Sequence, residues 1–291
     1  MKRENSSNRC LSCPVACGAD RPFRAGACGV KGLRIAKYYL HPFEEPCISH
    51  TNGSGTIFFC GCNLRCAFCQ NYEVSRAERG KEITPSQLVE IFKELEKAGA
   101  DNISLVTPSH LIPYLLQAFE IYQPKIPVVY NSSGYDKIEE LEKIDKYIDI
   151  YLPDFKFFSP DLAFRYTGRT DYPETAKAAI SFMAKKPVRF DANGKMRSGI
   201  IVRHLVMPLC KNDSFSILKW LKENLPQDAF VSLMSQYTPF GKIEKFPELN
   251  RKITAREYDA VLTKAWELNI ENLFAQERAS SGEKYIPKWD F

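Results

Sequence analysis

The chain has 291 residues and a mass of 33.3 kDa, and 44% of its residues are apolar, so it can bury a large core without disulfide bonds. Its formal charge of +5 is scattered along the chain instead of forming one basic block, which argues against a nucleic-acid partner. Residues 1–8 are polar, and no apolar run is long enough to cross a bilayer. We therefore expect no membrane association and a cytoplasmic location.

The N-terminal segment is rich in cysteine, glycine and proline and shows neither helical nor alternating periodicity. Four of the ten cysteines of the chain lie here, at Cys10, Cys13, Cys17 and Cys28. Four thiolates with tight turns between them predict a bound metal, but zinc and an iron–sulfur cluster both use four thiolates, and the spacing does not decide between them. We expect residues 1–53 to form a Cys-rich metal-binding segment and linker, and residues 54–291 to form the main domain.

From residue 54 onward, short apolar strands alternate with amphipathic helices. Apolar runs predict strands at Thr56–Cys60, Ile103–Thr107, Val128–Asn131, Ile148–Leu152, Ile200–Met207 and Phe230–Met234, with a weaker one at Asn272–Ala275. Capping boxes predict helices that begin after Thr84 and Thr254. This alternation predicts an α/β fold with a parallel sheet, and six or seven units suit an open, partial (β/α)6-type barrel. Ligands collect at the C-terminal strand ends of such folds, so the following loops are the expected site.

Three cysteines follow the first of these strands within one loop, at Cys62, Cys66 and Cys69. Three thiolates can ligate three irons of a [4Fe–4S] cluster and leave the fourth iron open to a small molecule. A zinc knuckle or a chance clustering of cysteines is the alternative. Zinc prefers four ligands in paired Cys-x2-Cys units, and no paired fourth ligand lies nearby, so the triplet favours the cluster.

The Cys-x3-Cys-x2-Cys spacing, with an aromatic residue before its last cysteine, resembles that of the radical S-adenosylmethionine (SAM) superfamily. The runs Gly61-Cys62-Asn63-Leu64-Arg65-Cys66 and Cys69-Gln70-Asn71-Tyr72 resemble the activating-enzyme branch, in particular relatives of pyruvate formate-lyase activating enzyme. The resemblance covers about residues 54–280. It implies an anaerobic oxidoreductase that binds a [4Fe–4S] cluster and SAM and cleaves SAM reductively to a 5′-deoxyadenosyl radical. The radical would take a hydrogen atom from a protein or peptide, with a flavodoxin or ferredoxin-type reductant.

The resemblance also implies SAM contacts. Phe68 stands where the family presents an aromatic ring to adenine, although core filling is the alternative. Where the family commonly shows Gly-Gly-Glu, this chain has Thr107-Pro108-Ser109-His110, so Thr107 and Ser109 are the candidates to accept from the methionyl amine. A polar turn after the third strand offers oxygens to ribose or carboxylate, or is an ordinary turn; it contains Asn131, Ser132 and Ser133.

Charged residues follow the fourth predicted strand and lie within the fifth. Asp154 and Lys156 resemble the Asp-x-Lys of activating enzymes, which lies beside the SAM methionine and the substrate peptide, and a spacing of two puts both on one face. A solvated ion pair is the alternative. Arg203 is a candidate to bind a charged substrate, because a guanidinium stays ionised when partly desolvated. His204 is either a SAM contact or a hydrogen-bonded core histidine. Two glutamines end later strands without an assigned role, Gln236 and Gln276.

Two other functions stay open at this point. A radical SAM enzyme acting on a small metabolite would have a narrow, closed pocket, whereas a peptide needs an open lateral groove. A non-catalytic electron carrier or metal-binding module is the alternative of another class. Carriers normally have fully ligated clusters in smaller folds, which argues against it. The remaining cysteines are expected to be packed thiols, at Cys47, Cys60 and Cys210.

Overall fold

The fold is built on one ten-stranded sheet in the computed structural model, which describes residues 9–21, 23–77, 79–240 and 243–276. The strand order is β10-β9-β8-β6-β5-β4-β2-β1-β3, and β7 pairs with β8. Neighbouring strands run parallel from β2 to β10. These parallel strands are β2 (Ser54–Phe59), β4 (Ile103–Val106), β5 (Val128–Ser132), β6 (Ile150–Pro153), β8 (Met196–Leu205), β9 (Phe230–Met234) and β10 (Leu273–Ala275). The predicted α/β fold with a parallel, open barrel is confirmed.

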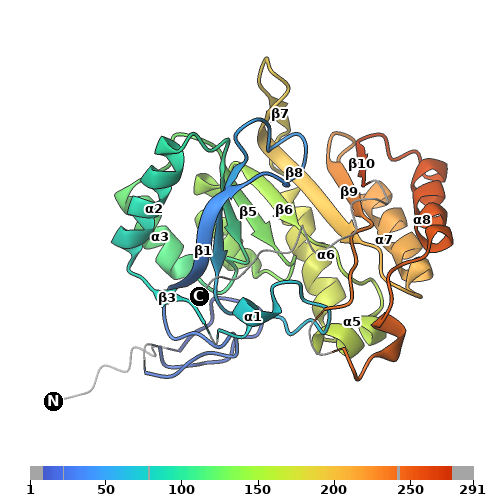
Figure 1. The fold of residues 1–291 in the computed structure, drawn as a ribbon, viewed down its shortest axis with the longest axis horizontal. Coiled ribbons are helices and arrows are strands. Elements are labelled where there is room, and N and C mark those ends of the chain that lie inside the picture. The colour runs from blue at the N-terminus through green and yellow to red at the C-terminus, as the bar shows by residue number, and fades with distance from the viewer. Residues whose placement is uncertain (1–8, 22, 78, 241–242, 277–291) are drawn as a thin grey trace.

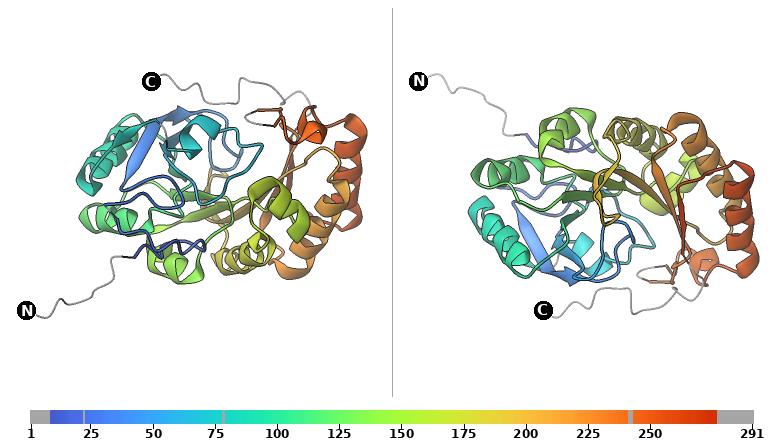
Figure 2. Two further views of the ribbon diagram at one scale, coloured as in Figure 1. Left: turned by 90° about the horizontal axis from the view of Figure 1, so that it is seen from below. Right: turned by 90° about the horizontal axis from the view of Figure 1, so that it is seen from above.

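The helices between the strands cover the outer side of the curved sheet (Figure 1 and Figure 2). Both predicted capping boxes are present: the side chains of Thr84 and Thr254 accept from the amides of Gln87 and Glu257. These boxes begin two of the helices and fix where the chain leaves the preceding loop. The helices are α2 (Pro85–Lys97), α3 (Ile112–Ile121), α4 (Ile138–Ile144), α5 (Pro160–Thr167), α6 (Tyr172–Met183), α7 (Lys211–Asn224) and α8 (Ala255–Glu267).

One strand lies where the sequence predicted only a linker. β1 (Arg34–His41) pairs antiparallel with β2, and β3 (Lys81–Glu82) pairs with β1 at the edge of the sheet. The expected boundary at residue 53 therefore falls inside a hairpin. β1 buries few of its side chains, so it lacks the apolar run that marks the central strands. The strand at β8 also begins earlier than predicted, because β7 (Arg189–Phe190) pairs with its first residues.

The loop between β1 and β2 closes the N-terminal end of the barrel. Cys47 and Ile48 are buried there against residues of β5, β6 and β8. The amide of Met196 donates to the carbonyl oxygen of Cys47 at 2.8 Å, and the side chain of Asn102 donates to that of Ile48 at 2.6 Å. The loop fills the end of the barrel opposite the expected site.

The described part of the N-terminal segment lies near the C-terminal strand ends, close to the short helix α1 (Tyr72–Ser75) (Figure 1). Residues 1–8, expected to be polar and without an apolar signal, lie outside the described residues, as do residues 277–291 of the expected main domain. No helix in the described ranges combines the length and the apolar character needed to cross a membrane.

Candidate functional site

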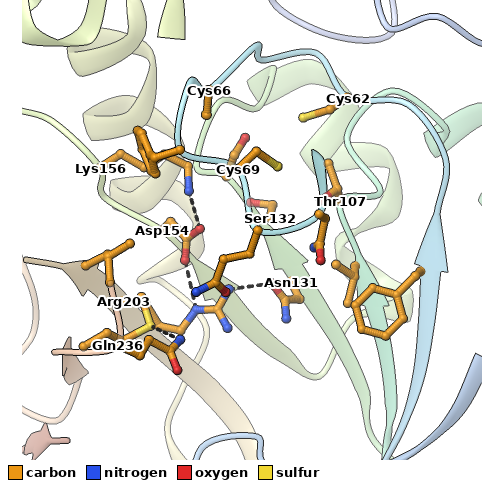
Figure 3. A pocket seen from close by; sticks show the side chains of 18 of the residues that line it. Cys62, Cys66, Cys69, Thr107, Asn131, Ser132, Asp154, Lys156, Arg203 and Gln236 are labelled. Atoms are coloured by element: carbon orange, nitrogen blue, oxygen red, sulfur yellow. Dashed lines mark hydrogen bonds and ion pairs between the residues drawn. The ribbon is translucent and has the colours of Figure 1, made fainter. Parts of the chain in front are cut away.

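A cavity of about 230 Å³ opens where the loops after β2, β4, β5 and β6 meet the C-terminal end of β8. Figure 3 shows the three cysteines at one end of this cavity, Arg203 and Gln236 at the other, and Asp154 between them. Most of the predicted site residues line it together, although they come from five separate loops or strand ends. The lining includes Cys62, Cys66, Phe68, Cys69, Thr107, Asn131, Ser132, Ser133, Asp154, Lys156 and Arg203.

The cysteine loop is held by its backbone and by one side chain. The amide of Ala67 donates to the carbonyl oxygen of Tyr166 at 2.8 Å, and the side chain of Asn63 donates to that of Tyr135 at 2.7 Å. Cys66 is 9% exposed, and burial raises the pKa of its thiol to about 12, with Cys69 adding to the rise and Lys156 opposing it. A metal would have to displace that proton on binding.

The donor set fits an iron–sulfur cluster better than a single ion. Three soft thiolates from one loop face the same cavity. No three His, Cys, Asp or Glu side chains within the described ranges come together as the ligands of one metal ion. A [4Fe–4S] cluster takes one thiolate per iron, so its ligands stand further apart than those around a single ion. Cys62, Cys66 and Cys69 are therefore suited to hold three irons.

Asp154 is the centre of a charge network in the cavity. Its carboxylate accepts from Lys156 Nζ at 2.6 Å and from Arg203 Nε at 2.9 Å, and all three side chains are less than one-fifth exposed. Burial alone would raise the pKa of Asp154, but Arg203 and Lys156 hold it below its ordinary value. The pKa of Lys156 is raised, because Asp154 and Cys66 outweigh its burial. Both groups are therefore ionised at neutral pH.

Arg203 extends this network toward two acidic residues that sequence analysis missed. Its guanidinium donates to Asn131 Oδ1 at 2.7 Å and lies 3.9 Å from Glu44. Burial raises the pKa of Glu44 to about 7, with Arg203 opposing and Glu45 and Asp154 adding to the rise. Burial also raises the pKa of Glu45. Both glutamates belong to the loop after β1, so no strand-end pattern marked them; an adjacent acidic pair before a proline is the only local signal.

The polar turn after β5 is partly committed to the fold. Ser132 Oγ donates to Asp136 at 2.6 Å and accepts from the amide of Gly134 at 3.1 Å. Ser133 Oγ is buried without a hydrogen-bond partner among the described residues, and Ser133 lines the cavity. Ser133 is therefore the hydroxyl of this turn that is available to a ligand.

Thr107, which also lines the cavity, holds a φ of +60°, which is rare for a β-branched residue and arises where β4 ends at the cavity.

Two predicted SAM contacts do not line the cavity. His204 Nδ1 lies 2.8 Å from the carbonyl oxygen of Phe155 and Nε2 lies 2.8 Å from Ser214 Oγ, so its ring is fully engaged on the helix side of β8. Burial lowers its pKa to about 4, as expected for a core histidine. Ser109 is buried beside Asp136, behind the turn that follows β4. We remove both from the candidate site. Gln236 and Gln276, which had no assigned role, line the cavity.

Comparison with known proteins identifies similar sequences and a similar fold. Residues 56–191 match the family model of the radical SAM superfamily. The uncharacterized protein MJ0674 of Methanocaldococcus jannaschii is 29% identical over 286 residues, 93% of this chain and 78% of that one. Pyruvate formate-lyase-activating enzyme of Clostridium pasteurianum is 24% identical over 236 residues, 76% and 91% respectively. The structure of Streptococcus suis SuiB bound to precursor peptide SuiA has a TM-score of 0.50 at 14% identity, over 74% of this chain and 46% of that chain.

Proposed function

Because this chain belongs to the radical SAM superfamily over residues 56–191, we propose that it abstracts a hydrogen atom from a protein or peptide, as activating enzymes do. Membership implies a [4Fe–4S] cluster and SAM, which together supply a 5′-deoxyadenosyl radical by reductive cleavage of SAM. The sequence similarity to an activating enzyme supports the proposed substrate class. A flavodoxin or ferredoxin-type protein is the proposed reductant.

One observation carries the proposal: the cysteine triplet and the Asp154 network face each other across a single cavity. In this arrangement Cys62, Cys66 and Cys69 hold the cluster. Lys156 and Arg203 are fixed by one carboxylate, so both present cationic donors without reorganising when a carboxylate of SAM or substrate arrives. Phe68 lines the same cavity as the proposed support for adenine, although its side chain is only 6% exposed and also packs at a steep angle against Phe157 in the core.

The test is turnover without substrate. Anaerobically reconstituted protein, reduced with dithionite, should convert SAM slowly to 5′-deoxyadenosine and methionine, measured by chromatography. The triplet variant Cys62→Ala/Cys66→Ala/Cys69→Ala is the control and should give none. If the wild type holds a cluster by spectroscopy but never forms deoxyadenosine, the radical function is wrong. Reversible one-electron reduction without SAM cleavage would instead indicate an electron carrier.

A small-metabolite substrate is the second candidate, favoured by one feature. The loop between β1 and β2 closes the N-terminal end of the barrel, and its Glu44 and Glu45 line the cavity, which supports a pocket that is closed on that side. The two candidate functions differ in the size of the substrate. Cell extract should be divided by ultrafiltration, and each fraction added to the SAM assay. Acceleration by the high-molecular-weight fraction supports a protein substrate, and acceleration by the filtrate supports a metabolite.

A further inference from the structure

The four N-terminal cysteines come together in three dimensions. The amide of Cys10 donates to the carbonyl oxygen of Ala19 at 2.9 Å and the amide of Gly18 donates to that of Cys10 at 3.1 Å, so the stretches that carry Cys10 and Cys17 lie side by side. A turn closed by the amide of Ala16, which donates to the carbonyl oxygen of Cys13 at 2.9 Å, carries Cys13 to the same place. Gly26 leaves room between two of the sulfurs: a Cβ there would lie 3.3 Å from Cys28 Sγ and 3.4 Å from Cys17 Sγ. We call this group the four-cysteine site.

A charged donor lies against one sulfur of this site. The Arg21 guanidinium donates to Cys28 Sγ at 2.7 Å, while its other terminal nitrogen donates to the carbonyl oxygen of His110 at 3.3 Å. Hydrogen bonds to sulfur stabilise thiolates, and a cation beside them stabilises a centre that becomes more negative on reduction.

The four-cysteine site touches the loop that carries the cysteine triplet. The amide of Cys62 donates to the carbonyl oxygen of Cys28 at 3.2 Å. Gly61 permits this approach, because it holds a φ of +80° and a Cβ there would stand 2.6 Å from the same oxygen. From standard bond lengths, this hydrogen bond puts Cys28 Sγ and Cys62 Sγ within about 12 Å of each other.

We propose that the four-cysteine site holds a second [4Fe–4S] cluster, fully ligated by Cys10, Cys13, Cys17 and Cys28, that is redox-active. With every iron ligated by thiolate, it has no open position for SAM. It takes one electron from a low-potential donor of the iron–sulfur or flavin protein class and returns it on reoxidation, with no bond made or broken. The charged donor at Cys28 and the contact with the loop of the cysteine triplet favour this cluster over zinc.

Metal analysis tests the identity of the centre. The triplet variant Cys62→Ala/Cys66→Ala/Cys69→Ala should retain about four irons and four sulfides per chain, against about eight of each in the wild type. On dithionite reduction it should show the electron paramagnetic resonance (EPR) signal of a one-electron-reduced cluster. Zinc in place of iron, or iron without a reducible signal, overturns the proposal. The result does not depend on radical chemistry, so it separates failure of this inference from failure of the proposed function.

Magnetic coupling tests whether the second cluster lies close to the cluster of the cysteine triplet. This test rests on the proposed function, which places a cluster at the triplet. With both clusters reduced, two paramagnets this close should broaden each other, so the wild-type EPR spectrum should differ from the sum of the spectra of two variants. One is the triplet variant, and the other is Cys13→Ser/Cys28→Ser. A spectrum equal to that sum, with both clusters present, would place the two centres apart.

Arg21 supplies a test that keeps every ligand. Arg21→Gln removes the charged donor to Cys28 Sγ and should lower the midpoint potential of the second cluster in an EPR-monitored redox titration of the triplet variant. Arg24→Gln is the matched control, because the Arg24 side chain lies in the same segment and donates to the backbone of Gly18 at 3.4 Å. Equal potentials in the two variants would show that Arg21 does not act on a redox centre.

Discussion

Asp154 balances two cations that would otherwise repel each other in a mostly buried cavity. Lys156 and Arg203 each donate to a different oxygen of its carboxylate, so the position of both depends on one side chain. Breaking a buried pair leaves an uncompensated charge, which costs about 3–5 kcal/mol. Such a network is therefore expected to be sensitive to a change that alters charge and not shape.

Asp154→Asn should weaken SAM binding at least about tenfold, equivalent to about 1.4 kcal/mol, because Lys156 and Arg203 lose the carboxylate that orients them. Iron content should not change, since no cysteine is altered. Equilibrium binding of SAM to the reconstituted protein measures the effect. Glu174→Ala, which breaks a surface ion pair with Lys177, is the control. Wild-type affinity in Asp154→Asn would remove this residue from the SAM site.

Glu44 should make stability depend on pH. Its pKa is raised from an ordinary 4.5 to about 7, chiefly by burial, so its contribution to stability is present below pH 4.5 and is lost as pH rises through 7. Glu44→Gln stays neutral throughout. The free energy of unfolding of this variant relative to wild type should therefore increase between pH 5 and pH 8, measured by anaerobic urea denaturation. Glu120→Gln, on the exposed face of α3, is the control.

At the scale of elements, the start of α8 depends on one carboxylate. Glu257 accepts from the amide of Thr254 at 2.8 Å, from both terminal nitrogens of Arg251, and from the amide of Leu209 at 2.8 Å. Leu209 holds a φ of +61°, so this contact also secures a strained turn after β8. In the capping box of α2, the Gln87 side chain accepts from the amide of Thr84 at 2.9 Å, and within the part of the chain that the structure describes it makes no hydrogen bond to a distant loop.

Glu257→Gln should therefore destabilise the protein by more than the about 1 kcal/mol typical of a lost cap, which is the cost expected for Thr84→Ala. The pKa of Glu257 is held well below its ordinary value, mainly by Arg251, so its contribution is present above pH 4.5 and is lost at lower pH. The difference in unfolding free energy between wild type and Glu257→Gln should shrink as pH falls below 4.5. Equal costs for the two variants at pH 7 would mean that the Leu209 and Arg251 contacts contribute nothing.

At the scale of the whole molecule, the N-terminal segment and the barrel meet at Gly61. The two parts of the chain are far apart in sequence, yet the carbonyl oxygen of Cys28 lies where a side chain at residue 61 would begin. Close approach of backbone to backbone requires glycine at such a position. The contact ties the four-cysteine site to the cysteine triplet.

Gly61→Ala should cost about 1–3 kcal/mol more than Gly194→Ala, because the added methyl group overpacks the contact with Cys28. Gly194 is the matched control: its φ of +75° is close to the +80° of Gly61, but an added Cβ there meets nothing within 4 Å. Thermal unfolding of both variants measures the difference, and iron content shows whether the triplet still binds its cluster. Equal melting temperatures would show that the two segments do not need this contact.

The sequence alone predicted the fold class and several residues of the cavity, because both depend on local patterns. Apolar runs separated by capped helices specify parallel strands, and residues at the ends of those strands meet at one edge of the sheet. Arg203 was proposed from its place in such a strand, the cysteine triplet from its spacing, and Asp154 and Lys156 from the resemblance of their run to that of activating enzymes. The N-terminal cysteines were recognised as a set from their number and the turns between them.

Only the tertiary structure decided which side chains meet. Successive residues of β8 face opposite sides of the sheet. Arg203 therefore enters the cavity, whereas His204 is hydrogen-bonded to Phe155 and Ser214 on the helix side. The register of the strand determines which of the two side chains faces the cavity. Glu44 reaches Arg203 from a loop at the opposite end of the barrel, and Cys28 reaches Cys62 from outside it. These contacts join residues that are far apart in the chain, because the sheet curves and its closing loops pack against it. Neither the curvature nor the loop packing can be predicted from the periodicity of apolar residues in the sequence.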